Sequence, residues 1–158
     1  MNSKKIEIRG DNLKAEDIDH LVGDSEISVE LSDSALAKIK QSYQFLHEEL
    51  DNKIIYGINT GFGPMASHIL AKGQLQELQL NLILSHAVGM GKPIKPEYVL
   101  AAMVVRLNTL AKGYSGVSPE LVQLLATFIN KRITPRVPEH GAVGTSGDLV
   151  QLAHIALA

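Results

Sequence analysis

Apolar and polar residues alternate in the N-terminal part of the chain and later recur every three or four positions. The segments 5–9 and 26–30 alternate with period two, which is typical of β-strands. A helical pattern over 15–22 lies between these segments. We therefore expect two short strands, paired with each other and separated by a short helix.

Helical spacing dominates the remainder of the chain. The expected helices cover 33–50, 72–87 and 96–112, and two more begin at Ser118 and Asp148. Ser32 or Asp33 can cap the first of these, and Ser118-Pro119-Glu120 combines a cap, a proline in the first turn and an acid. Segments rich in glycine and proline separate the helices: 56–64 is expected to be a loop, 89–93 to end the second helix, and 134–147 to be irregular.

Each helix carries apolar residues on one face. In the first helix after the strands they are Leu36, Ile39, Tyr43, Leu46 and Leu50, and in the helix after Ser118 they are Leu121, Leu124, Leu125, Phe128 and Ile129. Leu149 and Leu152 are expected on the buried face of the last helix. That helix runs to Ala158 without a capping glycine or a polar tail, so we expect a fragment whose missing remainder covers the face.

The composition is that of an ordinary globular protein and predicts one domain, with 45% apolar and 20% charged residues among 158. A net charge of −2 without a basic stripe argues against a nucleic-acid partner. The absence of cysteine excludes disulfides and zinc thiolates, and no two histidines have metal-ligand spacing on a helix. With no secretory signal and no long apolar stretch, we expect a cytoplasmic protein without a membrane partner.

Three glycine-containing segments could carry chemistry. Gly144 to Asp148 places one serine among small residues before a helix, but Asp148 occupies the last position of the G-x-S-x-G pattern of serine hydrolases. A simple helix cap at Asp148 is the alternative interpretation. Gly61 to Ala66 has the spacing of a dinucleotide-binding loop, but Pro64 removes an amide there and no βαβ alternation surrounds it. Gly91-Lys92 lacks the upstream glycine of a phosphate-binding loop.

Four blocks stand in a fixed order between Ile54 and the end of the chain. They are YGINTGFG from Tyr56 to Gly63, NLILSH from Asn81 to His86, RLNTLAKGYSG from Arg106 to Gly116, and GAVGTSGDL from Gly141 to Leu149. This series resembles the histidine and phenylalanine ammonia-lyase family. The first and last blocks are the most specific, and the first fifty residues contribute little.

The resemblance implies an electrophile made from the protein backbone. In that family an Ala-Ser-Gly tripeptide cyclises to a methylidene-imidazolone group, and here the matching residues are Thr145, Ser146 and Gly147. The amide nitrogen of Gly147 attacks the carbonyl carbon of Thr145, water leaves as the ring closes, and Ser146 then loses its hydroxyl to leave an exocyclic methylene. Thr145 replaces the usual alanine, but its side chain hangs off the ring, so we expect the group to form without an external cofactor.

The resemblance also implies roles for other residues. Elimination of ammonia needs a base because the β-proton of the substrate is not acidic, and the family assigns this role to the tyrosine that matches Tyr56. A tyrosine can act as a base only when nearby positive charge or the electrophile itself makes its hydroxyl more acidic. Asp148 matches an acid that supports the ring-forming backbone, or it only caps the helix. The positions that correspond to substrate-binding residues are Gly63, Ser85 and His86.

The substrate implied by the resemblance is an aromatic L-amino acid. Ser85-His86 is similar to the pair in histidine-specific members, which form urocanate, whereas plant phenylalanine-specific members carry Phe-Leu. Some tyrosine-specific members, which form coumarate, also carry Ser-His, and 148–152 lacks the alanine and proline that follow Asp-Leu in most histidases. We place histidine first, with tyrosine ammonia-lyase or tyrosine aminomutase as alternatives. An inactive helical scaffold is the non-enzyme alternative, against which Tyr56, Ser146 and Gly147 argue together.

The fold implied by the resemblance is mainly α. Residues 1–158 would form the helical N-terminal domain of the aromatic amino acid lyase (fumarase/aspartase-like) fold, with a short two-stranded β element near the N-terminus. The central helix bundle and the C-terminal part would be absent from this chain. Because active sites in the family combine loops from three subunits of a homotetramer, we expect a homotetrameric full-length protein and an inactive fragment.

Overall fold

The computed structural model describes residues 4–50, 52–70, 72–142 and 149–158. The chain divides into two compact units, each made of two separate stretches of sequence. The first unit comprises Met1–Leu46 and Ile94–Pro135, and the second comprises His47–Pro93 and Arg136–Ala158. Among the residues that the structure describes, no helix is both long and apolar enough to cross a membrane.

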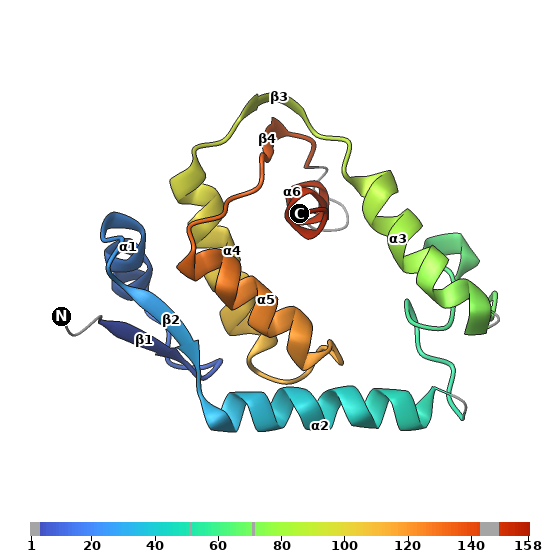
Figure 1. The fold of residues 1–158 in the computed structure, drawn as a ribbon. Coiled ribbons are helices and arrows are strands. Elements are labelled where there is room, and N and C mark those ends of the chain that lie inside the picture. The colour runs from blue at the N-terminus through green and yellow to red at the C-terminus, as the bar shows by residue number, and fades with distance from the viewer. Residues whose placement is uncertain (1–3, 51, 71, 143–148) are drawn as a thin grey trace. The chain divides into compact units, whose positions relative to one another are not determined.

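The first unit begins with two strands joined by a helix, as the alternating pattern predicts (Figure 1). Strand β1 (Lys5–Ile8) pairs in parallel with β2 (Ser28–Leu31), and α1 (Ala15–Gly23) lies between them in the chain. Parallel strands need a long crossover connection, which α1 and its flanking turns provide. The predicted strand pair and intervening helix are confirmed.

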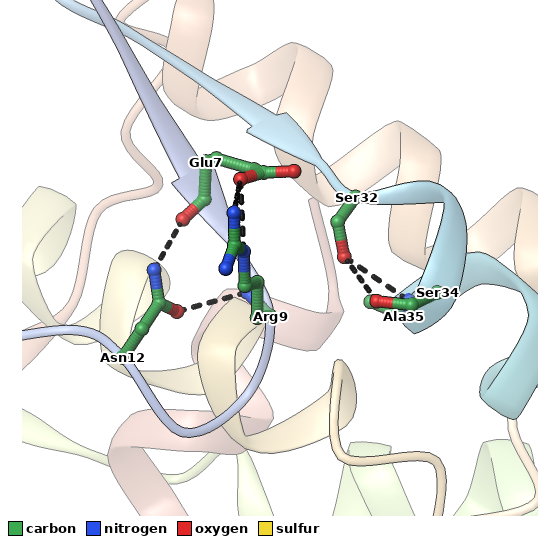
Figure 2. Close-up of polar contacts among 6 residues, drawn as sticks. All are labelled: Glu7, Arg9, Asn12, Ser32, Ser34 and Ala35. Carbon is green, nitrogen blue, oxygen red and sulfur yellow. Dashed lines mark hydrogen bonds and ion pairs between the residues drawn. The ribbon is translucent and has the colours of Figure 1, made fainter.

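Side-chain hydrogen bonds fix the chain where β1 and β2 end (Figure 2). After β1, the side chain of Asn12 donates to the carbonyl of Glu7 at 2.8 Å and accepts from the amide of Arg9 at 3.0 Å. After β2, Ser32 Oγ accepts from the amide of Ala35 at 3.1 Å. Ser32 therefore caps the next helix, in agreement with the sequence prediction.

Three longer helices complete the first unit: α2 (Asp33–Glu49), which belongs to this unit as far as Leu46, α4 (Pro96–Leu110) and α5 (Pro119–Asn130). Ser118 Oγ accepts from the amide of Leu121 at 3.2 Å and caps α5 as expected. Helix α4 packs against α1 and α5, and α5 packs against β2. The core of the unit consists of buried apolar side chains, among them Ile8, Leu21, Val29, Ile39, Val99, Met103, Val104, Leu107, Val122 and Ile129.

Two residues at the end of α5 bind the backbone of the β2 region. The side-chain amide of Asn130 accepts from the Val29 amide at 2.7 Å and donates to the Val29 carbonyl at 2.9 Å. Arg132, at a φ of 56°, donates to three carbonyl oxygens, those of Leu21, Asp24 and Ile27. These side chains satisfy backbone groups that neither β1 nor α1 can reach.

The second unit contains α3 (Leu75–His86), α6 (Leu149–Ala156) and a small antiparallel sheet. Short 3-10 turns at Gly63–Met65 and Lys72–Gln74 precede α3. Strand β3 (Met90–Pro93) pairs with β4 (Pro138–His140), with Met90 opposite His140. In Figure 1 the two strands lie next to each other, and α3 packs against α6.

One sequence expectation about the second unit was wrong in part. The segment 134–147 was expected to be irregular, yet it contributes β4, and its partner β3 lies in 89–93, where only the end of a helix was expected. Their glycines, prolines and exposed side chains give no apolar alternation, so the pairing depends on a partner distant in the sequence.

The buried face of α6 is shifted by one residue from the expected one. Val150 and Ala153 are buried, at 9% and 7% exposure, whereas Leu149 and Leu152 are 41% and 37% exposed. Both pairs are apolar with the same spacing, so periodicity could not separate them. Leu121 and Leu124 on α5 are likewise exposed, and Val122 is buried instead.

Candidate active site

Tyr56 begins a tight turn in the second unit and projects an exposed ring. The side chain is 62% exposed, and its hydroxyl oxygen accepts a hydrogen bond from the amide of Gly63 at 3.1 Å. The ring meets Phe62 edge to face, with 5.9 Å between centroids. Because the oxygen is the acceptor in this bond, the hydroxyl hydrogen remains available to another group.

Two buried polar side chains, those of Asn59 and Thr60, fix the turn through hydrogen bonds to its backbone. Asn59, which is 7% exposed, accepts from the Ile55 amide at 2.7 Å and donates to the carbonyls of Lys53 and Leu50 at 2.7 and 3.2 Å. Thr60 Oγ1 accepts from the Gly57 amide at 3.2 Å and donates to the Gly61 carbonyl at 2.9 Å. The Asn-Thr pair of the first block therefore sets the backbone that carries Tyr56.

The glycines of this block are needed for close approach. Gly57 has a φ of 75°, and a Cβ there would lie 2.9 Å from Cε1 of Phe62. A Cβ on Gly61 would lie 2.6 Å from Cβ of Met65. Gly61 directly follows Thr60, which forms an isolated antiparallel β-bridge with Ile69. A larger residue at either position would move the turn and Tyr56 with it.

Helix α3 joins the Tyr56 turn and the Ser85-His86 pair. Near its start, Gln79 Nε2 donates to the carbonyl of Gly57 at 2.9 Å. At its end, His86 Nδ1 lies 2.8 Å from the carbonyl oxygen of Leu82, and Ser85 Oγ donates to the same carbonyl at 2.9 Å. A carbonyl can only accept, so this contact is a hydrogen bond in the tautomer whose Nδ1 carries the hydrogen, and Nε2 is then the acceptor.

The predicted tripeptide Thr145-Ser146-Gly147 and Asp148 lie outside the described residues. The residues on either side of 143–148 are described, and they are in contact. A Cβ on Gly141, whose φ is 142°, would lie 2.7 Å from Cγ1 of Val150. Gly141 and Val150, which flank these residues in the sequence, are therefore close together.

The second unit contains every predicted site residue that the structure describes: Tyr56, Gly63, Ser85 and His86. The residues that flank the tripeptide belong to the same unit. No role was predicted for Asn59, Thr60 or Gln79 from the sequence. For the first two, their place between the glycines of the first block was the available signal, whereas nothing in the local sequence marks Gln79.

Comparison with known proteins identifies the family. The family model described as aromatic amino acid lyase matches residues 13–158. The chain belongs to the aromatic amino acid lyase family. This confirms the resemblance drawn from the four sequence blocks, and it extends the match into the N-terminal residues that carry no recognisable motif.

Two curated members of the aromatic amino acid lyase family illustrate the match. A probable histidine ammonia-lyase of Thermoplasma volcanium is 48% identical over 97% of this chain. The histidine ammonia-lyase of Macrococcus caseolyticus is 43% identical over 96% of it. The matched region is 31% and 30% of these relatives, so the chain spans less than a third of their length.

Solved structures of aromatic amino acid lyases have the same fold. The ergothioneine-degrading ergothionase of Treponema denticola matches 98% of this chain with a TM-score of 0.91 and 30% identity. Histidine ammonia-lyase from Trypanosoma cruzi matches 97% with a TM-score of 0.86 and 36% identity. Tyrosine aminomutase from Streptomyces globisporus matches 96% with a TM-score of 0.85 and 35% identity. The chain covers 31%, 29% and 28% of these structures, and the predicted mainly α lyase fold is confirmed.

Proposed function

We propose that the protein containing this chain is an ammonia-lyase that eliminates ammonia from an aromatic L-amino acid, with histidine as the first candidate. The observation that carries the proposal is the Tyr56 turn, in which an exposed hydroxyl is held by the Gly63 amide. Further support comes from family membership and from curated relatives that are histidine ammonia-lyases at 43–48% identity.

The proposed electrophile is a methylidene-imidazolone formed from Thr145, Ser146 and Gly147. When formed, this group would accept electron density from the substrate and make the β-proton easier to remove. Support for this group comes from the sequence match of these three residues and from membership of the aromatic amino acid lyase family. Asp148 follows the tripeptide directly and would support this backbone.

Tyr56 would remove the β-proton of the substrate. Its hydroxyl hydrogen is not used by the bond from Gly63, and the amide of Gly63 stays as a partner for the oxygen after the hydrogen has left. The supporting bonds from Asn59, Thr60 and Gln79 fix the turn, so the hydroxyl is positioned before the substrate binds. Gly63 would line the pocket through its backbone.

His86 would recognise the ring of the substrate. With Nδ1 donating to Leu82, Nε2 is an acceptor for a hydrogen-bond donor on the substrate. An imidazole N–H and a phenol O–H are both such donors, whereas a phenyl ring has none. This chemistry supports histidine or tyrosine over phenylalanine. Tyrosine stays as the second candidate, because a tyrosine aminomutase is among the similar structures.

The first test is the mass of the tryptic peptide that begins at Val137, taken from the full-length protein. We expect a mass two waters below the sequence value, and the full residue mass in Ser146→Ala. Chromatography of the products then identifies the reaction: urocanate or coumarate for a lyase, and a β-amino acid for an aminomutase. Normal turnover in Ser146→Ala would refute the mechanism.

The assembly and location of the protein belong to the same proposal. We propose a cytoplasmic homotetramer that binds neither nucleic acid nor membrane, and a fragment of 158 residues that is inactive by itself. Light scattering of the full-length protein tests the tetramer. Assaying the fragment beside the full-length protein tests the need for the rest of the chain.

A further inference from the structure

Helix α3 connects two parts of the candidate site within the second unit. In its first half, Gln79 Nε2 donates to the carbonyl of Gly57 at 2.9 Å. At its end, His86 Nδ1 lies 2.8 Å from the carbonyl oxygen of Leu82, one turn back along the same helix. The turn that carries Tyr56 and the imidazole of His86 are therefore both attached to α3.

The helix itself sets the spacing between these two attachments. His86 follows Gln79 by seven positions, which is about two turns and roughly 10 Å along the axis, so both residues lie on the same side of α3. The helix is continuous from Leu75 to His86 and packs against α6. Groups carried by a helix are held more precisely than groups carried by a loop, so the spacing changes only if an attachment is released.

Gln79 is the attachment that joins the Tyr56 turn to α3. The bonds from Asn59 and Thr60 come from residues that follow Tyr56 within four positions, whereas Gln79 is 22 positions away from Gly57. The amide of Gly57 donates to Thr60 and its carbonyl accepts from Gln79, so both peptide groups beside this residue are held. A glycine has the widest conformational freedom, so loss of Gln79 would release the turn at its most flexible residue.

We propose that Gln79 is a positioning residue that sets the spacing between the proposed base, Tyr56, and the proposed ring-recognition residue, His86. Through this spacing it selects substrates by the length of the side chain that carries the ring. The selection rests on the proposed function, because it uses the roles assigned there to Tyr56 and His86. Gln79 touches neither the substrate nor the reacting atoms in this role.

A fixed spacing distinguishes the two candidate substrates because their side chains differ in length. In each of them the β-proton meets Tyr56, and a donor on the ring meets Nε2 of His86. The phenol of tyrosine places its donor farther from the β-carbon than the imidazole of histidine does. Misplacement of the reacting atoms by about 1 Å can slow a reaction 100-fold. The amino acid of the wrong length would therefore bind but react slowly.

Three substitutions on α3 test the role of Gln79. Gln79→Met keeps the length of the side chain without a donor, and Gln79→Glu keeps its shape but turns an oxygen toward the Gly57 carbonyl. Gln76→Met is the matched control, because Gln76 is also exposed on α3 and its side chain makes no hydrogen bond within the described part of the chain.

The first measurement is hydrogen exchange with mass spectrometry on the full-length protein, which does not depend on activity. The amides of Ile58 and Asn59 report on the turn, because both donate to the Ile55 carbonyl. We expect their exchange to speed up about fivefold in both Gln79 variants, the factor that one ordinary hydrogen bond represents. Gln76→Met should leave it unchanged.

The second measurement is steady-state kinetics with L-histidine and L-tyrosine. We expect kcat for the better substrate to fall about fivefold in both Gln79 variants, while its KM stays near the unsubstituted value. The poorer substrate already lies out of position and loses less, so the ratio of the two kcat/KM values should move toward one. Gln76→Met should keep kcat and the ratio.

A double substitution separates positioning from general damage to the fold. In Tyr56→Phe no hydroxyl remains to be positioned, so adding Gln79→Met should lower kcat no further. Damage to the fold would lower kcat by the same factor with and without the hydroxyl. Circular dichroism reports whether each variant folds.

The outcomes separate the role of Gln79 from the proposed function. If the unsubstituted protein eliminates ammonia from neither amino acid, the proposed function is refuted, and the selective role of Gln79 with it. If it is active and both folded Gln79 variants keep kcat and the substrate ratio, the role of Gln79 alone is overturned. Equal losses with and without the Tyr56 hydroxyl would also overturn it. If Gln79→Met does not fold, Gln79→Glu decides by the same criteria.

Discussion

Arg132 offers a direct test of how the first unit is held together. Its Nη1 donates to the Leu21 carbonyl at 2.6 Å, and its Nη2 donates to the carbonyls of Asp24 and Ile27 at 2.6 and 3.2 Å. Leu21 lies in the last turn of α1, where carbonyls have no partner within the helix. One guanidinium thus closes the C-terminal end of α1 and the turn into β2, and a cation there also suits the helix dipole.

The expected loss can be estimated for Arg132→Ala. A hydrogen bond to a charged group contributes about 1.5–3 kcal/mol, but three bonds from one half-buried side chain are not additive and water replaces part of them. We therefore expect about 2 kcal/mol of local stability to be lost. Since 1.4 kcal/mol is a factor of ten, amide exchange should speed up roughly 30-fold in the α1–β2 connection.

Two further variants separate the contributions of side chain and backbone. Arg132→Lys keeps the charge but cannot fork between carbonyls, so its exchange should lie between those of the unsubstituted protein and Arg132→Ala. Arg132→Gly removes the side chain but relieves a left-handed φ of 56°, at a cost of about 1 kcal/mol for other residues. It should exchange about fivefold more slowly than Arg132→Ala.

The assay is hydrogen exchange with mass spectrometry on the full-length protein, with attention to the peptide that covers 20–28. Exchange at the amides of Asp24 and Ile27 is informative because each bonds within this connection. Peptides from β3 and α6 serve as the internal reference. Exchange in Arg132→Ala that equals the unsubstituted rate would refute the claim that the guanidinium holds the α1–β2 connection.

Three other predictions test the supporting contacts and the base. Asn59→Ala should loosen the turn that carries Tyr56 by about 2 kcal/mol, because it removes three hydrogen bonds, and faster exchange at Ile55 measures this. Asn130→Asp keeps the acceptor for the Val29 amide but turns an oxygen toward the Val29 carbonyl, so β2 should exchange at least tenfold faster than in the unsubstituted protein. Tyr56→Phe should keep the peptide mass of the formed electrophile but lower kcat by at least about 100-fold, the scale of general base catalysis, and full activity would assign the base to another residue.

Sequence reasoning recovered those elements whose signals are local. The two strands, α1, the caps at Ser32 and Ser118 and the helix after Pro119 all follow from period, cap chemistry or the position of proline. Each of these depends on residues within a few positions of one another. The same reasoning missed β3 and β4, whose ladder joins Met90 to His140 and therefore exists only in the folded unit.

Errors in the predicted core have a related cause. On α6 the pairs Leu149–Leu152 and Val150–Ala153 have the same spacing and are both apolar, so the pattern gives no direction. The buried side of α6 depends on its contacts with the rest of the second unit, and the structure buries Val150 and Ala153. Polar anchors such as Gln79 and Asn130 escape prediction for the same reason, since each binds backbone atoms far away in the sequence.

The proposed site and its supporting residues differ in exposure. Under the proposed function Tyr56 meets a substrate and its identity is set by the chemistry, and the structure leaves it 62% exposed. Asn59 is 7% exposed and acts only by fixing where Tyr56 lies. Many side chains could in principle fill such a supporting place, so the choice depends on the three-dimensional fit. Under the proposed function, motifs therefore indicate the groups that react, whereas packing determines the groups that position them.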